Sequence, residues 1–379
     1  MAGIYIHIPF CKRRCDYCAF FSTMLGEEAK SRYVARLCGE AAERNDYLGG
    51  KPVSSVYFGG GTPSQLSIGE LADIFAALKA NFQIDSGAEI TMEVNPDDIT
   101  PAYAAGLRSL PVNRISMGVQ SFHDSLLGAI HRRHTAEGAV EAYNMLRKAG
   151  FDNISIDLIY ALPGETLEQW GEDLRRAIAL RPEHVSAYAL SFEEGTPLYA
   201  RLGRGEVAEL SEDSYAQMYA LLIKALRSAG YEHYEISNFA LPGRRARHNS
   251  SYWTGAPYLG LGAGAHSFDG DSRRVNLPDV AKYISAERVP CESERLTAAE
   301  EYDEMVMTRL RTCEGISLPA LEARFGREAR SYIISMAESY IASGKLKIEG
   351  LGGGDLRLKL TEEGVLISDA IISDLMNPD

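Results

Sequence analysis

The sequence has no excess of positive charge: 39 Lys and Arg residues stand against 52 Asp and Glu residues, which gives a net charge of -13 over 379 residues. A general nucleic-acid binder needs a basic surface to hold phosphates, so this charge argues against that class and leaves open only a local basic patch. No apolar run approaches the roughly 20 residues that cross a bilayer, and no basic segment with an apolar core and a cleavage site opens the chain. Internal repeats and low-complexity segments are also missing. These absences predict an ordinary globular protein of the cytoplasm without a transmembrane segment.

Cysteine is scarce outside one short stretch. Three of the six cysteines, Cys11, Cys15 and Cys18, lie within eight positions, and the others are scattered. A chain of this length stabilises itself by burying a core, so a framework of three disulfides is not required. Clustered cysteines in a chain without an export signal more often ligate a metal. Packing roles are predicted for the remaining three, Cys38, Cys291 and Cys313.

The clustered cysteines lie in the stretch C-K-R-R-C-D-Y-C, residues 11–18, which follows the apolar run at residues 4–8. Iron-sulfur clusters and zinc prefer thiolate ligands, so three thiols in one loop can bind one soft metal centre. A 4Fe-4S cluster takes a thiolate on each of four irons, so this loop would leave one iron open to a small molecule. The alternative is a structural zinc site in which His7 completes a Cys3His set. That alternative is weakened because His7 precedes the cysteines on the predicted strand and no second C-x-x-C pair occurs.

Short runs rich in Val, Ile and Tyr alternate with helix-period segments over the first two thirds of the chain. Capping-box patterns at Ser67 with Glu70 and at Thr166 with Gln169 support the helices. Regular alternation implies parallel strands joined by right-handed crossovers. Special residues follow several different strands, which favours a partial (β/α)6 barrel, with its chemistry at the C-terminal ends of the strands, over an open nucleotide-binding sheet. The six predicted strands are 3–8, 53–58, 89–94, 114–119, 153–159 and 184–190, with 231–236 as a possible seventh.

A second, smaller unit is predicted from about residue 296. Helices followed by a β-hairpin resemble a winged-helix module, which often binds DNA. Residues 296–379 hold 9 Lys and Arg against 15 Asp and Glu, so a lid or partner-docking role is favoured over DNA reading. The predicted elements of this unit are helices at 298–311, 318–325, 330–343 and from 362, with strands at 345–348 and 356–360 around a glycine-rich turn at 350–354. The predicted division of the whole α/β chain is a barrel core at 1–240, a connecting segment at 241–295 and a winged-helix-like α+β domain at 296–379.

The spacing C-x-x-x-C-x-x-C resembles the signature of the radical S-adenosylmethionine (SAM) superfamily, in which the amino and carboxylate groups of SAM occupy the open iron. The surrounding run Y-I-H-I-P-F-C, residues 5–11, resembles the oxygen-independent coproporphyrinogen III oxidases and, within them, the haem-chaperone (HemW-like) branch. The resemblance spans nearly the whole chain. It implies that Cys11, Cys15 and Cys18 bind a 4Fe-4S cluster and that SAM completes the cluster. In this superfamily an electron from the cluster cleaves SAM into methionine and a 5'-deoxyadenosyl radical.

Motifs at the ends of successive predicted strands resemble the SAM pocket of this family. Residues 59–63, G-G-G-T-P, follow the second strand; consecutive glycines let main-chain groups touch a ligand closely, although such a run is often only a tight turn. Glu93 ends the third strand, where a carboxylate can accept hydrogen bonds from ribose hydroxyls or act as a cap. Each residue is ordinary alone, but their joint order across five strands is hard to obtain by chance. The resemblance implies that SAM is bound by Tyr5, His7, Tyr17, Gly60, Gly61, Thr62, Glu93, Gln120, Arg132, Asp157 and Ala189.

The motif H-N-x-x-Y-W at residues 248–253 lies outside the strand pattern. A lone histidine is more often a hydrogen-bonded structural residue. An exposed imidazole beside Tyr and Trp also suits a haem, which needs an axial nitrogen and flat apolar walls. The motif resembles the one that marks the haem-chaperone branch, and this resemblance implies haem binding through His248, Tyr252 and Trp253.

Two departures separate the chain from the oxidases of this family. Those carry a fourth cysteine two positions beyond the triplet, where this sequence has Phe20, and an N-terminal extension, whereas Tyr5 stands almost at the start here. The prediction is therefore a haem chaperone that binds haem and transfers it to acceptor proteins. The enzyme alternative is SAM-dependent oxidative decarboxylation of coproporphyrinogen III; whether SAM is cleaved, and with which electron donor, stays open. A third class, a DNA-binding regulator with an iron-sulfur sensor, rests only on the winged-helix resemblance and fits the acidic charge poorly.

Overall fold

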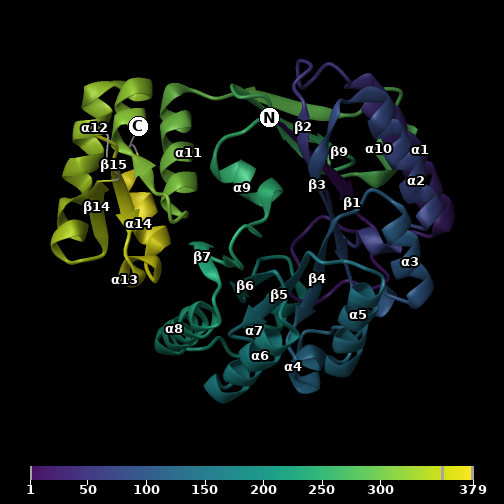
Figure 1. Ribbon diagram of the computed structural model, residues 1–379, viewed down its shortest axis with the longest axis horizontal. Helices are drawn as coiled ribbons and strands as arrows, with labels where there is room; N and C mark the ends of the chain where they lie inside the picture. Colours follow the sequence, from purple (N-terminus) through teal and green to yellow (C-terminus); the bar gives the residue numbers. More distant parts are fainter. Residues whose placement is uncertain (1, 351–353, 377–379) are drawn as a thin grey trace.

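The computed structural model describes residues 2–350 and 354–376 of the chain. At its centre, six parallel strands pair in chain order, each with the next. Figure 1 shows the connecting helices on the outer side of these strands. The predicted partial (β/α)6 barrel is therefore confirmed. Its strands are β1 (Ala2–Ile8), β2 (Val53–Gly60), β3 (Ile84–Val94), β4 (Arg114–Gln120), β5 (Ile154–Tyr160) and β6 (His184–Ala189).

The connecting helices bury one apolar face against the sheet and leave a polar face outside, as amphipathic helices do. Both predicted capping boxes are present, at Ser67 before α2 (Ile68–Asn81) and at Thr166 before α6 (Leu167–Leu180). In each capping box the two side chains accept hydrogen bonds from main-chain N–H groups that would otherwise be unpaired, and this stabilises the N-terminus of the helix. The remaining helices of the barrel are α1 (Glu27–Glu43), α3 (Pro101–Ser109), α4 (Asp124–Ala129), α5 (Ala136–Lys148), α7 (Pro197–Gly203) and α8 (Glu212–Ser228), with 3-10 turns η1 (Pro63–Gln65) and η2 (Pro96–Asp98).

The strand predicted at 231–236 forms as β7 (Glu232–Glu235), but it does not extend the parallel barrel. It pairs antiparallel with β8 (Asn238–Ala240), which in turn pairs antiparallel with β6. Only two residues separate β7 from β8, and a parallel neighbour would need a crossover of a dozen or more residues. The parallel part of the sheet therefore ends at β6.

A sheet extension continues from the other side of β1. Strand β9 (Tyr258–Leu261) pairs in parallel with β1, and three antiparallel strands follow it: β10 (His266–Phe268), β11 (Ser272–Asn276) and β12 (Cys291–Arg295). Two helices, α9 (Arg247–Trp253) and α10 (Val280–Ser285), belong to the same segment. The sequence predicts only a connecting segment here, because strands of three to five residues are too short to show a period of two clearly.

A buried carboxylate, that of Glu40 in α1, holds the sheet extension against the barrel. Its oxygens accept hydrogen bonds from the Tyr283 hydroxyl at 2.7 Å, the Gly262 amide at 2.8 Å and the Asn276 side-chain amide at 2.8 Å. Arg44, one turn further along the chain, donates to the Gly260 carbonyl at 2.9 Å. Glu40 is fully buried, so these bonds form away from water and tie the extension to α1.

The C-terminal unit packs around a hydrophobic core of its own. Gly326, with a φ of 88°, interrupts α12, so the helices predicted at 318–325 and 330–343 are confirmed as two helices on either side of a kink. The predicted hairpin is confirmed by the pairing of β14 with β15, and β13 adds a third strand. The predicted turn at 350–354 lies largely outside the described residues. The elements are α11 (Ala298–Leu310), β13 (Ile316–Ser317), α12 (Leu318–Ala342), β14 (Leu346–Gly350), β15 (Leu356–Leu360), α13 (Glu362–Val365) and α14 (Ser368–Leu375).

Main-chain hydrogen bonds join the C-terminal unit to the barrel. The Ile236 amide donates to the Arg311 carbonyl at 3.1 Å, and the Cys313 amide donates to the Tyr234 carbonyl at 3.0 Å. Figure 1 shows the unit standing beside α9 and β7, with α11 nearest to the rest of the molecule. Over the part of the chain that the structure describes, no helix has the length and apolar character to span a membrane.

Candidate functional site

The loop after β1 carries the three clustered cysteines at the edge where the parallel strands end. Its base is closed by main-chain hydrogen bonds from Cys11 to the Thr23 carbonyl at 2.9 Å and from Thr23 to the Pro9 carbonyl at 2.7 Å. All three thiols, those of Cys11, Cys15 and Cys18, are free of disulfides and line one cavity of about 490 Å³, here called the cysteine cavity. This is the edge at which barrel proteins place their chemistry.

Two polar neighbours of the thiols come from other loops, one between β2 and η1 and the other between α4 and α5. The Cys11 thiol contacts the Thr62 hydroxyl at 3.3 Å, and Arg132 donates to the Cys15 sulfur at 3.5 Å. Burial raises the pKa of the Cys11 and Cys18 thiols, whereas metal ligation requires thiolates. A guanidinium beside the loop favours the negative form, so Arg132 reduces the cost of holding three thiolates there.

The donor set fits an iron-sulfur cluster better than a single zinc ion. Within residues 2–350 and 354–376, no group of three His, Cys, Asp or Glu side chains is placed to hold one metal ion. A cluster binds each thiolate to a different iron, so the sulfurs need not meet at one centre. His7, the fourth ligand of the zinc alternative, already uses both ring nitrogens: Nδ1 pairs with the Tyr5 hydroxyl at 3.1 Å and Nε2 with the Phe21 carbonyl at 2.9 Å.

Most of the predicted SAM residues line the cysteine cavity. Tyr5 and His7 instead line a second, adjoining cavity, on the other side of Gly60. A Cβ on Gly60 would lie 2.6 Å from Cε1 of His7, and Gly60 has a φ of 110°, so only glycine fits this contact. The residues that do line the cysteine cavity are Tyr17, Gly60, Gly61, Thr62, Glu93, Gln120, Arg132, Asp157 and Ala189.

Two half-buried carboxyl groups, those of Glu93 and Asp157, lie in the wall of the cysteine cavity. Glu93 accepts a hydrogen bond from the Tyr57 hydroxyl at 2.7 Å, and Asp157 accepts one from the Ser116 hydroxyl at 3.0 Å. Burial raises the pKa of Glu93 to about 7 and also raises the pKa of Asp157. Hydroxyl donors from a ligand would favour the ionised forms, so these two groups can accept hydrogen bonds from a ligand that carries hydroxyls.

Asn95 and Arg114 are among the polar residues of this cavity that sequence reasoning missed. Asn95 accepts a hydrogen bond from Arg132 at 2.9 Å. Arg114 is 1% exposed, and among the described residues the Nε atoms of Arg114 and Arg132 are buried without a hydrogen-bond partner. Orphaned donors at a cavity point to a bound group that is not a side chain. Asn95 lies two positions after Glu93 and could have been found from that position, whereas Arg114 opens its strand and carries no such signal.

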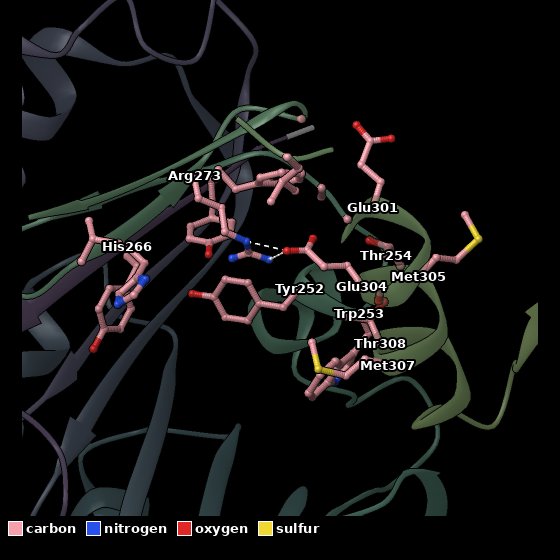
Figure 2. Close-up of a pocket in the computed structure, with 18 of the residues that line it drawn as sticks. Tyr252, Trp253, Thr254, His266, Arg273, Glu301, Glu304, Met305, Met307 and Thr308 are labelled. Atoms are coloured by element: carbon pink, nitrogen blue, oxygen red, sulfur yellow. Dashed lines mark hydrogen bonds and ion pairs between the residues drawn. The ribbon is translucent and has the colours of Figure 1, made fainter. Parts of the chain in front are cut away.

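The structure separates the three residues predicted to bind haem. Tyr252 and Trp253 line the second cavity (Figure 2). This cavity has a volume of about 750 Å³ and shares Ala19 and Phe20 with the cysteine cavity. His248 is fully buried beneath them. Its Nδ1 pairs with the Ser55 hydroxyl at 2.9 Å and its Nε2 with the Tyr252 hydroxyl at 2.9 Å.

Burial lowers the pKa of His248 to about 3, so the ring is neutral. A neutral imidazole has one donor and one acceptor nitrogen, and both are used here. Iron ligation by His248 would require one of these hydrogen bonds to break and the ring to be uncovered. The ligand role of His248 therefore stays a prediction.

Comparison with known proteins identifies the family. The radical SAM superfamily profile matches residues 5–177, and the HemN C-terminal domain profile matches residues 296–367. The chain is 37% identical over 325 residues to the "Heme chaperone HemW" of Lactococcus lactis subsp. lactis, covering 85% of this chain and 84% of that protein. It is 31% identical over 376 residues to the protein of the same name from Bacillus subtilis, covering 98% of each. The chain belongs to the HemW family.

The HemW family lies within the radical SAM superfamily, and this membership implies a 4Fe-4S cluster and SAM. Among solved structures, the Escherichia coli coproporphyrinogen III oxidase HemN is similar with a TM-score of 0.85 and 23% identity, covering 99% of this chain and 90% of that one. At that identity the likeness shows a common fold, including the C-terminal domain.

Proposed function

We propose that this chain is a haem chaperone of the radical SAM type, which binds haem and transfers it to acceptor proteins. The observation that carries the proposal is similarity along the whole chain to proteins named heme chaperone, as in the relative from Bacillus subtilis that covers 98% of both chains. The second cavity supports it, because its aromatic walls suit a flat apolar ligand. Acceptor proteins are the partners that this function requires.

We further propose that Cys11, Cys15 and Cys18 bind a 4Fe-4S cluster, with SAM at the iron that has no protein ligand. When bound, the cluster and SAM supply one-electron chemistry, which would make an electron donor a further partner. The chain's own residues hold these groups. Arg132 favours the ionised thiolates, residues 60–62 bring main-chain groups close to the methionyl amino group of SAM, and Glu93 accepts hydrogen bonds from the ribose hydroxyls.

Haem titration of the anaerobically purified protein tests the proposed function. We expect stoichiometric haem uptake with a defined Soret band, followed by transfer of the haem to an added apo-globin. With cluster, SAM and a reductant present, coproporphyrinogen III should remain unconverted, because Phe20 replaces the fourth cysteine of the oxidases. Absence of haem uptake would contradict the chaperone function, and robust formation of protoporphyrinogen would assign the oxidase activity instead.

Glu93 should make SAM binding depend on pH. The pKa of Glu93 in the folded protein is about 7, above the usual value of 4.5. Glu93 therefore lowers the stability of the folded state progressively as the pH rises from 4.5 to about 7. Ribose hydroxyls prefer the carboxylate, so SAM affinity should fall about tenfold for each pH unit below the pKa. Equilibrium binding between about pH 6 and about pH 8 measures this slope. In Glu93→Gln the slope should flatten, and an equal slope in both proteins would exclude Glu93 as its source.

A further inference from the structure

Three histidines lie at or beside the second cavity, and they differ in the state of their ring nitrogens. His7 and His248 are buried, and both nitrogens of each ring have hydrogen-bond partners. His266 lines the cavity and is exposed, and its ring makes no hydrogen bond within the part of the chain that the structure describes. Haem iron takes a neutral imidazole nitrogen with a free lone pair. His266 can offer such a nitrogen without breaking a hydrogen bond to another described residue.

The main chain holds His266 firmly in the cavity wall. His266 pairs with Val275 in the ladder between β10 and β11. A Cβ on Gly260 of β9 would lie 2.0 Å from the His266 carbonyl oxygen. Strands β9 and β10 can therefore lie this close together only because residue 260 is a glycine. Figure 2 shows His266 on the sheet side of the cavity, across Tyr252 from the residues of α11 such as Met307. A ligand between these walls would therefore meet a well-placed imidazole.

The cavity walls suit a large, flat and mostly apolar ligand. The volume of about 750 Å³ falls within the range of roughly 300–1,000 Å³ that small-molecule sites occupy. Two apolar side chains of the wall are unusually exposed, Phe20 at 70% and Met307 at 39%. Tyr252 and Trp253 add aromatic surface (Figure 2). Exposed apolar area gathered in one cavity marks a place where a ligand is bound.

Among the residues that the structure describes, the ion pairs in the wall leave one cation available for an anionic group. Arg273 pairs with Glu304 at 2.6 Å, and Arg324 pairs with Glu301 at 2.9 Å. Arg309, the third arginine of the wall, donates to a main-chain carbonyl at 2.9 Å and has no carboxylate partner among the ion pairs of the described residues. Haem carries two propionates, and a guanidinium binds carboxylates through two parallel hydrogen bonds.

We propose that haem binds in the second cavity, between the sheet extension and α11, with His266 as axial ligand and Arg309 at a propionate. The inference rests on the proposed haem-chaperone function and adds a location and a ligand to it. It puts the haem next to the cysteine cavity, because the two cavities share Ala19 and Phe20.

The test compares hemin binding by the wild type, His266→Ala and His131→Ala. Since His266 is exposed, His266→Ala should fold like the wild type. Loss of the imidazole should weaken hemin binding about tenfold or more and shift both the Soret band and the ferric EPR signal. Added free imidazole should restore the wild-type spectrum, which a merely structural role would not allow. His131 is also exposed, pairs with Asp16 at 2.7 Å and lines neither cavity, so its variant should match the wild type.

The outcomes separate this inference from the function on which it rests. Wild-type affinity and spectrum in His266→Ala would overturn the inference and leave the chaperone function standing. A folded His248→Gln variant that alone loses the haem spectrum would assign the iron to His248 instead. If the wild type takes up no hemin, the proposed function itself fails.

A second variant tests the propionate contact. Arg309→Gln should weaken the binding of hemin more than the binding of hemin dimethyl ester, which has no carboxylate charge. An equal loss for both ligands would contradict the contact between Arg309 and a propionate.

Discussion

Replacement of Cys15 by alanine should reduce the iron content of the reconstituted protein from about four atoms per chain to near zero. Two remaining thiolates cannot hold a cluster that three of them bind, and the Arg132 guanidinium would lose the sulfur to which it donates. SAM binds through the open iron, so SAM affinity should fall about tenfold or more. Iron and sulfide analysis, EPR of the reduced protein and equilibrium SAM binding measure these changes.

The matched control is Cys291→Ala. Cys291 is a half-buried free cysteine on β12, an edge strand of the sheet extension, and it does not line the cysteine cavity. This variant should keep the full iron content and the wild-type SAM affinity. If Cys15→Ala retains as much iron as Cys291→Ala, the cysteine loop does not hold the cluster and the cofactor assignment is wrong.

Glu40→Ala should lower the free energy of unfolding of the barrel by about 3–5 kcal/mol. The substitution removes the acceptor of hydrogen bonds from Tyr283, Gly262 and Asn276 and leaves these donors buried and unpaired. Thermal and urea unfolding followed by circular dichroism measure the change. Because Glu40 anchors the extension that carries His266, haem binding should weaken as well.

Glu43→Ala provides the control on the same helix. The Glu43 side chain is 41% exposed and pairs with Arg36 at 3.0 Å, so its loss should cost no more than about 1 kcal/mol. Equal destabilisation by the two variants would show that the carboxylate of Glu40 has no special role in joining the extension to α1.

The barrel could be predicted because each of its strands and helices has a recognisable residue pattern within its own segment of the sequence. Ile4, Ile6 and Ile8 are fully buried, and their alternation with polar residues marks β1 without reference to any other segment. The capping residue Ser67 likewise marks a helix start within four positions of itself.

The strands of the sheet extension have no such local residue pattern. These strands are short, and the attachment of the extension to the barrel depends on partners far away in the sequence: β9 pairs with β1, and the Gly262 amide donates to Glu40, 222 positions away. The close approach of Gly260 to His266 appears only once β9 and β10 pair, and a lone glycine in a sequence does not indicate it. Local periodicity therefore showed only a connecting segment at 241–295.

By itself the sequence determined the family, the order of the barrel strands and the cysteine loop, because each depends on residue types at short and regular spacings. Only the tertiary structure decided which side chains share a cavity. It placed Tyr5 and His7 in the wall of the adjoining cavity, enclosed His248 and, among the described residues, left the ring of His266 without a hydrogen-bond partner. The physical reason is that burial and hydrogen bonding of a side chain depend on segments that meet only when the chain folds, and no local spacing encodes them.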